Sequence, residues 1–400
     1  MITRLRIQGF RGIADETIEF GPLTVLVGRN GAGKSAVVDA LRFIRDALFD
    51  GLENAVSRRN GFDAIRHCPY GGILVPRVAF DAMFDQHDGE SRLSGSYRFA
   101  LVSHDNDVYR VVDERCVTHE TDPQGPPTLV QQPPLVVNRF GESRLGLMLP
   151  RTNSFSGASK EVTTLFRGIY YHLFSSDMRE PRAASNERIL SDDAANLTTV
   201  LREMQRAKDG GAAKRAVLDA LGRIVPDVRD FRVQELAGFL VAQLLHGPAA
   251  EAAQGNGDGS RGAGTWLGLH QESDGTLRAL ATLAALYQEV PPSYGGPLSL
   301  EEPENALHPD ALAVLADSIR EAATRRQIIL TTQSPDLIAR FRADELRVVE
   351  RVDGATRVGP LAEHQRKAIE QELFGAGDLL RIEGLQRDPV TSIPTQDASA

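Results

Sequence analysis

The 400-residue chain lacks a long hydrophobic run and has only two cysteines. Its longest apolar stretch, residues 279–287, is half the length of a membrane-spanning helix, which needs about 18 residues. We therefore predict no membrane partner. Cys68 and Cys116 lie far apart and belong to no metal-spaced cluster, which predicts a reducing, cytoplasmic location. We expect no signal peptide, because the strand-like residues 2–7 begin at once.

Basic residues are fewer than acidic residues. The chain has 45 Lys and Arg residues against 54 Asp and Glu residues, a net charge of −9. This balance argues against a surface that binds nucleic acid throughout, although it leaves a local basic groove open. Sustained heptads and internal repeats are absent, which excludes a long coiled-coil arm. Four hundred residues suffice for a main domain that carries an inserted subdomain.

A complete phosphate-binding loop is the strongest motif in the chain. Residues 28–35, GRNGAGKS, match the pattern GxxxxGK[ST]. A buried strand is predicted over residues 23–27, and apolar residues at spacings of four, three and four predict an amphipathic helix over residues 37–48. This strand–loop–helix context is the one that the motif requires, because backbone N–H groups and the helix N-terminus then surround phosphate oxygens. We therefore predict a nucleoside triphosphate site.

Each position of this loop has an expected role. Lys34 is expected to contact the β- and γ-phosphates, and the Ser35 hydroxyl is expected to hold Mg²⁺. The residues predicted to contact the nucleotide here are Gly28, Arg29, Asn30, Gly31, Ala32, Gly33, Lys34, Ser35 and Ala36.

Two adjacent carboxylates follow a short apolar strand in residues 297–309, PLSLEEPENALHP. Phosphoryl transfer needs one carboxylate in the Mg²⁺ shell and another that orients the attacking water. Neighbouring residues at a strand end point in different directions, so one pair can meet both needs. We assign Glu301 to the metal and Glu302 to catalysis. The alternative is a solvated acidic turn before a helix, where Glu is favourable in any case.

A polar residue follows the next apolar strand, residues 327–330. Gln333 lies where a γ-phosphate sensor is expected, at the carboxyl end of a strand beside the nucleotide, and we assign it to catalysis. A structural alternative is also strong here, because Ser334 fits a helix N-cap and Pro335 the first helical position.

A further anion site is suggested by ESDGTLR, residues 272–278, at the start of an apolar helix. Ser273 as the N-cap and an unhindered Gly275 would leave several N–H groups free at the helix N-terminus. The same three residues, Ser-Asp-Gly, also form ordinary turns. We include Ser273 and Gly275 among the nucleotide-binding residues.

The element order predicts an α/β protein. Alternating apolar residues over 73–118 predict an antiparallel meander, and residues 194–204 and 213–225 are the clearest helices that follow. Residues 123–134 hold five prolines and are expected to be a connector. The predicted domains are an N-terminal ATPase lobe with phosphate loop and meander (1–122), a mostly helical insert or lid with a flexible loop at 247–264 (123–265), a C-terminal ATPase lobe (266–387) and a tail (388–400).

Together these motifs resemble the ABC-type ATPases of the SMC/RecF/OLD group, in particular stand-alone bacterial AAA-family ATPases of about this length. The resembling segments, in family order, are residues 5–13, 28–35, 189–201, 273–275, 301–309 and 332–335. The resemblance implies a P-loop NTPase fold with an SMC-head-like mixed sheet flanked by helices, an antiparallel β meander and a helical insert. It also implies ATP and Mg²⁺ as cofactors. Arg11 matches a family position near the nucleotide, although an exposed arginine at a strand end would be equally ordinary.

The resemblance further implies a homodimer that closes on ATP. Ser273 and Gly275 of one subunit would cap the γ-phosphate held by the loop of the other. Two positions depart from the family pattern, because Glu301 replaces the usual aspartate and Gln333, which cannot protonate, replaces the usual histidine. A Q-loop glutamine is not assigned, and we expect no TOPRIM nuclease of the kind that some OLD-type proteins carry, because too few residues follow residue 350.

Three functions fit these features. The first is an ATP-driven dimer that acts on DNA in maintenance, repair or antiphage defence, which the resemblance favours. The second is a regulatory ATP switch that turns over slowly and controls a protein partner such as a nuclease, which the acidic charge favours. The third, an ABC transporter ATPase subunit, is disfavoured by the insert and by the SMC-like opening segment.

Overall fold

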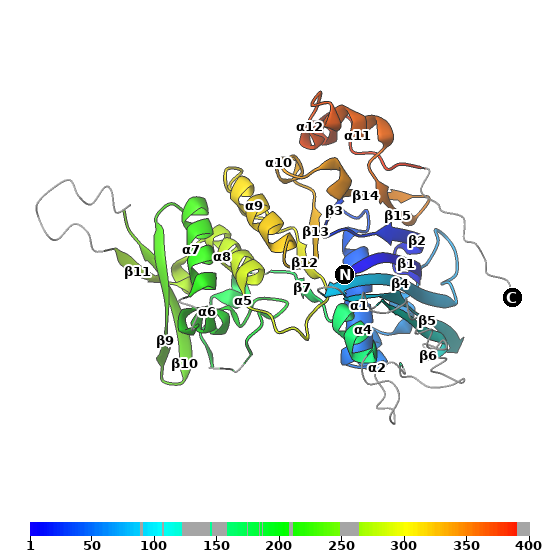
Figure 1. The fold of residues 1–400 in the computed structure, drawn as a ribbon, viewed down its shortest axis with the longest axis horizontal. Helices are drawn as coiled ribbons and strands as arrows, with labels where there is room; N and C mark the ends of the chain where they lie inside the picture. Colours follow the sequence, from blue (N-terminus) through cyan, green and yellow to red (C-terminus); the bar gives the residue numbers. More distant parts are fainter. Residues whose placement is uncertain are drawn as a thin grey trace, which may run out of the picture. The chain divides into compact units, whose positions relative to one another are not determined.

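The computed structural model describes residues 1–88, 91–105, 108–121, 145, 158–173, 175–183, 185, 187–207, 211–248 and 264–389 (Figure 1). The chain forms two compact units, each made of separated stretches. Unit 1 comprises Met1–Ile169, Pro292–Ser299 and Arg326–Ala400, and unit 2 comprises Tyr170–Pro291 and Leu300–Arg325. The predicted domain limits at residues 122, 265 and 387 stay a prediction. The predicted connector and nearly all of the loop at 247–264 and of the tail lie outside the described residues.

Unit 1 contains a five-stranded antiparallel sheet in the order β2-β1-β4-β5-β6. Its strands are β1 (Ile2–Phe10), β2 (Ile13–Glu19), β4 (Arg77–Asp88), β5 (Ser91–Asp105) and β6 (Val108–Thr121). The predicted meander is therefore present as β4, β5 and β6. Its alternating apolar residues face a core of packed rings, in which the centroids of Phe43 and Phe80 are 5.4 Å apart and those of Phe80 and Phe99 are 5.2 Å apart.

A second, six-stranded sheet has the order β15-β14-β3-β13-β12-β7. Its strands are β3 (Leu23–Val27), β7 (Ile169–Tyr171), β12 (Leu298–Glu301), β13 (Ile328–Thr332), β14 (Leu346–Val352) and β15 (Ala355–Pro360). Strand β3 pairs in parallel with both β13 and β14, and all five of its residues are buried. Burial on both faces explains why the sequence reads there as a continuous apolar run.

Helices complete unit 1. They are α1 (Lys34–Phe49), α2 (Leu52–Ser57), α3 (Phe62–Ile65), α4 (Ala158–Phe166), α10 (Pro335–Ile338), α11 (Glu363–Glu370) and α12 (Ala376–Ile382), with a 3-10 turn at Ala343–Glu345. Helix α1 covers the predicted amphipathic segment. It buries Val37, Leu41, Ile44 and Leu48, the four residues whose spacing predicted it.

Unit 2 combines helices with a small antiparallel sheet. Its helices are α5 (Ser175–Met178), α6 (Leu197–Arg206), α7 (Ala212–Ile224), α8 (Asp274–Tyr287) and α9 (Ala311–Ala323), with a 3-10 turn at Leu269–Gln271. Its strands are β8 (Arg182–Ala183), β9 (Val228–Leu236), β10 (Phe239–His246) and β11 (Thr265–Gly268). The two predicted helices are confirmed as α6 and α7.

The β9–β10 hairpin of unit 2 was not predicted. Its turn residues Ala237 and Gly238 have φ values of 50° and 83°, the left-handed conformation that two-residue hairpin turns require. One face of the hairpin packs on α6 and α7 (Figure 1). Burial alternates along β10, but its sequence FLVAQLLH is almost entirely apolar, so the Ala-Gly pair was the local signal for the turn.

No helix in the described parts of the chain is long and apolar enough to cross a membrane. The two cysteines are free, and Cys68 is exposed.

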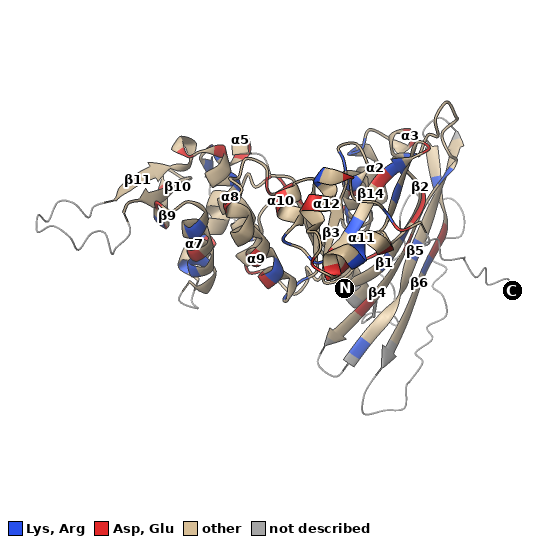
Figure 2. Cartoon of the chain, turned by 90° about the horizontal axis from the view of Figure 1, so that it is seen from above, with Lys and Arg blue, Asp and Glu red and all other residues tan. Residues whose placement is uncertain are grey.

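Lys and Arg residues share the helices and strands with Asp and Glu residues rather than occupying separate elements (Figure 2).

We predict that Gln327 is essential to the packing of unit 1. Its buried amide accepts a hydrogen bond from Ile2 N at 3.0 Å and donates to Ile2 O at 2.7 Å and to Gly21 O at 3.0 Å. Gln327→Leu leaves three backbone groups unsatisfied and should lower the free energy of unfolding by about 2–4 kcal/mol. Urea unfolding measures the change. The exposed Gln371→Leu is the matched control, and equal stabilities of the two variants would contradict this role.

Candidate functional site

The phosphate loop leaves the carboxyl end of β3 and leads into α1. Gly28 lies so close to the Val349 carbonyl of β14 that a Cβ at this position would overlap the carbonyl oxygen. Gly33 has a φ of 110° and forms the N-cap of α1, a conformation that favours glycine. The two glycines therefore let the loop turn tightly against the sheet before the helix begins.

The remaining loop residues present polar groups outward. Arg29, Asn30, Gly31 and Ser35 are exposed, whereas Lys34 is buried. The Lys34 ammonium donates hydrogen bonds to the carbonyls of Gly28 at 2.8 Å and Arg29 at 3.3 Å, so its charge lies within the curve of the loop. A Cβ on Gly31, whose φ is 76°, would meet no atom within 4 Å.

Thr356 of β15 braces the loop from behind. Its buried hydroxyl donates a hydrogen bond to the Ala32 carbonyl at 3.0 Å, and its backbone N–H bonds the Gly12 carbonyl at 2.7 Å. A Cβ on Gly33 would overlap this hydroxyl. The threonine therefore fixes both the loop and the turn between β1 and β2.

Gln333 emerges at the same sheet edge as the loop. Thr332, the last residue of β13, is the register partner of Val27, the last residue of β3. Because the two strands are parallel, the residues that follow them leave the sheet side by side. The predicted helix cap after Gln333 is also present. The Ser334 hydroxyl caps α10 by accepting a hydrogen bond from Leu337 N at 3.3 Å.

Arg11 lies in the turn between β1 and β2, with a φ of 48°. Its guanidinium nitrogen Nε contacts Asp39 Oδ2 at 2.7 Å, and its side chain remains 42% exposed. Asp39 lies in α1, four residues after Ser35, so it shares a helix face with the metal-binding candidate. This ion pair therefore connects Arg11 to α1, the helix that follows the phosphate loop.

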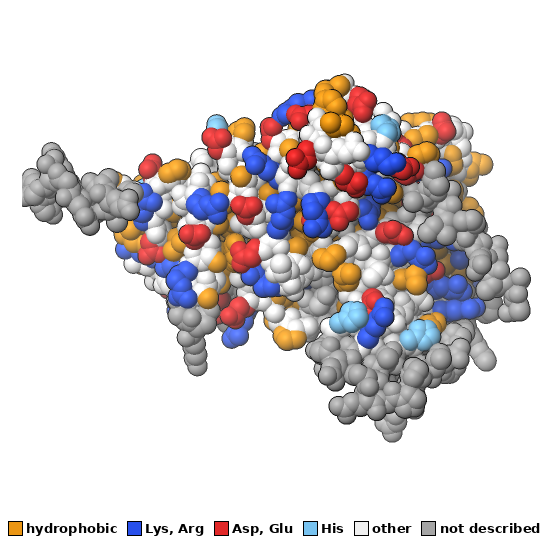
Figure 3. Space-filling model, turned by 45° about the horizontal axis from the view of Figure 1, so that its top comes forward, with side chains coloured by type: hydrophobic (Ala, Val, Ile, Leu, Met, Phe, Trp, Pro, Cys, Tyr) orange, Lys and Arg blue, Asp and Glu red, His pale blue; other side chains and the backbone are white. Residues whose placement is uncertain are grey.

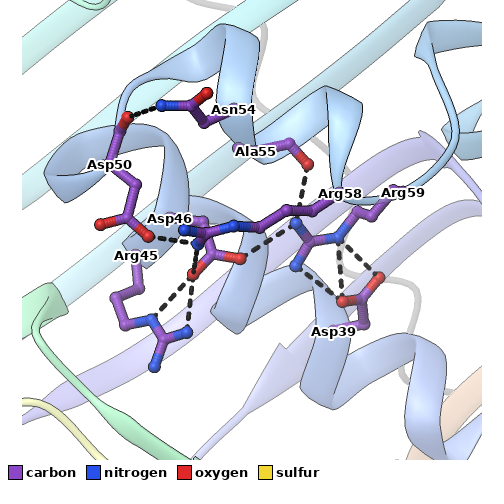
Figure 4. Close-up of polar contacts among 8 residues, drawn as sticks. All are labelled: Asp39, Arg45, Asp46, Asp50, Asn54, Ala55, Arg58 and Arg59. Atoms are coloured by element: carbon purple, nitrogen blue, oxygen red, sulfur yellow. Dashed lines mark hydrogen bonds and ion pairs between the residues drawn. The ribbon is translucent and has the colours of Figure 1, made fainter.

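A buried ion network holds Asp39 in place (Figure 4). Arg59, whose side chain is 5% exposed, contacts Asp39 Oδ1 at 2.8 Å and Asp46 Oδ2 at 3.0 Å. Asp46 also accepts from Arg45 at 2.7 Å, and Arg58 pairs with Asp50. Breaking a buried pair leaves an uncompensated charge, which typically costs 3–5 kcal/mol. The buried contacts of Arg59, together with the exposed Arg58–Asp50 pair, therefore tie the end of α2 to α1.

In unit 2, Ser273 and Gly275 begin α8 as the sequence predicted. The Ser273 hydroxyl caps the helix by accepting from Thr276 N at 3.1 Å. Gly275 packs against the Ala306 carbonyl so closely that a Cβ would overlap it. Hydrogen bonds from Arg179 and then Ser175 lower the pKa of Asp274, the residue between them. We call residues 270–275 the signature turn.

Glu301 and Glu302 follow β12 and lie in unit 2. The Glu301 carboxylate is 16% exposed, and its Oε1 lies 3.8 Å from Nδ1 of His172. Glu302 has a φ of 44°, a strained conformation for a non-glycine residue, and its Oε2 accepts from Asn305 Nδ2 at 3.1 Å. Such strain is concentrated at functional sites. The loop after Glu302 reaches the signature turn through Ala306.

The residues of each unit fit parts of a magnesium–nucleotide site. The open Gly31, the curved N–H groups and the N-terminus of the 16-residue α1 suit phosphate oxygens. No group of three or more His, Cys, Asp and Glu residues in the described part of the chain could hold a metal alone. The assignment of Mg²⁺ to the Ser35 hydroxyl and the Glu301 carboxylate stays a prediction.

Three structurally important residues were not predicted from the sequence: Asp39, Thr356 and Arg179. The fourth position after Ser35 is a signal that could have revealed Asp39, because it shares a helix face with Ser35. Thr356 lies 324 residues from Ala32, and Arg179 lies 95 residues from Asp274. No local sequence pattern therefore predicts either contact.

Two family models match the chain. One, described as "AAA domain, putative AbiEii toxin, Type IV TA system", matches residues 150–339, and one described as "AAA domain" matches residues 4–108. The chain is 23% identical over 399 residues to an OLD nuclease of Thermus scotoductus, covering 96% of this chain and 70% of the relative. It is also 29% identical over 123 residues to the DNA double-strand break repair Rad50 ATPase of Archaeoglobus fulgidus, covering 30% of this chain and 13% of that protein.

Solved structures of Smc head domains share the fold. One, bound to the C-winged helix domain of ScpA, has a TM-score of 0.53 at 14% identity and covers 92% of this chain and 99% of that chain. Another, from Pyrococcus furiosus and bound to the C-terminal domain of ScpA, has a TM-score of 0.52 at 13% identity, with coverages of 93% and 99%. The predicted fold class, an SMC-head-like mixed sheet flanked by helices, is confirmed. Together these matches support an ATPase of the SMC/RecF/OLD type, the group that the sequence motifs resemble.

Proposed function

We propose that this protein hydrolyses ATP to ADP and phosphate in a Mg²⁺-dependent reaction. The observation that carries this proposal is the braced phosphate loop, in which Lys34 lies within the curve and Thr356 holds the backbone of Ala32. A rigid loop of this kind presents N–H groups to phosphate without a further ordering cost. The loop is followed by an exposed serine hydroxyl at Ser35, the position that would hold the metal.

The proposed chemistry divides among five side chains. Lys34 neutralises charge on the β- and γ-phosphates, and Ser35 and Glu301 hold the metal, which when bound polarises the phosphate oxygens. Glu302 orients the attacking water and accepts its proton, with its carboxylate oriented by Asn305. Gln333 donates a hydrogen bond to the γ-phosphate, since an amide can donate but cannot protonate.

We also propose that the working form is a homodimer that closes on ATP. The N-terminus of α8, capped by Ser273, offers N–H groups and partial positive charge to an anion. In the dimer, Ser273 and Gly275 of one copy would contact the γ-phosphate bound by the loop of the other. Arg11, held by Asp39 beside the start of α1, would contact the nucleotide from its own copy.

The biological role that we favour is DNA maintenance, repair or antiphage defence. The similarity to an OLD nuclease and to a DNA double-strand break repair ATPase supports it. The second candidate is a slow regulatory switch that acts on a protein partner such as a nuclease. Two observations favour it: the similar Smc heads were solved with a ScpA domain, and positive and negative side chains intermix on the face of the protein in Figure 3.

We predict that Glu302→Gln traps an ATP-bound dimer. The amide cannot accept a proton from water, so turnover should fall roughly 10²- to 10⁴-fold while ATP still binds. Phosphate release gives the rate, and light scattering with ATP gives the mass. Glu289→Gln, on an exposed glutamate of the same unit, is the matched control. Undiminished turnover by Glu302→Gln would contradict the assignment of Glu302 to catalysis.

We predict that Thr356→Val weakens ATP binding at least several-fold. Valine keeps the shape but loses the hydrogen bond to Ala32, so the loop must be ordered when phosphate binds. Isothermal titration calorimetry with a non-hydrolysable ATP analogue measures the affinity. Thr282→Val is the control, because that buried hydroxyl has no hydrogen-bond partner among the described residues. Equal affinities of the two variants would refute the role of Thr356.

The two biological roles differ in their response to salt. A protein that clamps DNA should bind a duplex in the presence of ATP, and log K should fall linearly with log of the salt concentration. We expect this dependence under the favoured role, measured by fluorescence anisotropy with the Glu302→Gln variant. Absence of binding at about 50 mM salt would instead favour the regulatory switch.

A further inference from the structure

One arginine of unit 2 holds the signature turn from outside its own segment. Arg179 follows α5, and its guanidinium Nη1 donates to the carbonyls of His270 at 3.0 Å and Glu272 at 2.8 Å. Its Nη2 donates to Asp274 Oδ1 at 2.6 Å. The three partners lie at alternate residues that lead directly into α8, so one planar group fixes the whole approach to the helix.

The geometry of these bonds is specific to arginine. A guanidinium presents several donors in a rigid fork, whereas a lysine ammonium is a compact charge on a flexible stem. Two of the acceptors are backbone carbonyls, so the side chain restrains the backbone itself. The third, the Asp274 carboxylate, balances the charge of the guanidinium. This arrangement suits a structural clamp better than a group that binds phosphate directly.

Two other contacts hold the same turn. Glu272, whose side chain is 4% exposed, pairs with His246 Nε2 at 2.8 Å at the end of β10. Gly275 packs against the Ala306 carbonyl in the loop that follows Glu302. Arg179 is therefore one of several supports, and these two connect the signature turn to the β9–β10 hairpin and to the loop that follows Glu302.

We propose that Arg179 is a positioning residue that preorganises the signature turn for the γ-phosphate of ATP bound to a second copy of the chain. The inference rests on the proposed ATP-gated dimer. Without the clamp, residues 270–274 must be ordered when the dimer closes, and that ordering opposes association. Nucleotide binding by a single copy uses the loop at 28–35 and is independent of Arg179.

The test measures how ATP turnover depends on protein concentration. The rate per protomer should rise with concentration as dimers form, and Arg179→Ala should raise the concentration at half-maximal rate roughly tenfold or more. Affinity for a fluorescent ATP analogue at low protein concentration should not change. Arg182→Ala, an exposed arginine three residues further on, is the matched control and should match the wild type in both measurements.

A second variant separates positioning from direct charge. Arg179→Lys keeps the positive charge but loses the fork, so a positioning role predicts a defect close to that of Arg179→Ala. Full activity of Arg179→Lys would overturn the proposal in favour of a simple charge contact. Arg179→Ala with an unchanged half-maximal concentration, or with weakened analogue binding, would overturn it as well. A wild-type rate that is independent of concentration would contradict the dimer itself, and this inference with it.

Discussion

The parallel pairing of β3 with β13 and β14 is the constraint on which the nucleotide site depends. Val27 is the register partner of both Thr332 and Val348, so three segments lie together at the carboxyl ends of β3 and β13. They are the phosphate loop, the segment that begins with Gln333, and the β14–β15 hairpin that returns with Thr356. The hairpin then braces the loop through Ala32. The shape of the loop is thus restrained by residues more than 300 positions away in the sequence.

Unit 2 is organised around a second constraint, the close approach of Gly275 to Ala306. This contact leaves no room for a side chain at Gly275, so the start of α8 packs directly on the loop after Glu302. Under the proposed function, the signature turn and the catalytic carboxylate would then respond to the same nucleotide. Arg179 and His246 add further contacts that restrain the turn.

The parts of the fold that were predictable are those with a local signature. The run at 23–27, the loop motif and the apolar spacing of α1 are set by burial and backbone geometry within a short window. The capping role of Ser273 was equally local. The β9–β10 hairpin escaped because its strands lie in a region dominated by helical patterns, although Ala237-Gly238 marked the turn. Thr356 and Arg179 could not be predicted, because each donates a hydrogen bond to a backbone carbonyl far away in the sequence. A backbone carbonyl accepts from any donor, so neither contact requires a particular residue type or spacing.

A mixing experiment with two defective variants tests the composite site most directly. Lys34→Ala lacks a functional phosphate loop but keeps its signature turn, whereas Ser273→Arg keeps the loop and blocks the turn. Each variant alone should be inactive. If one subunit completes the site of the other, an equimolar mixture forms heterodimers with one intact site and regains a substantial part of wild-type turnover. A mixture no more active than the two variants measured separately would contradict a site shared between two copies.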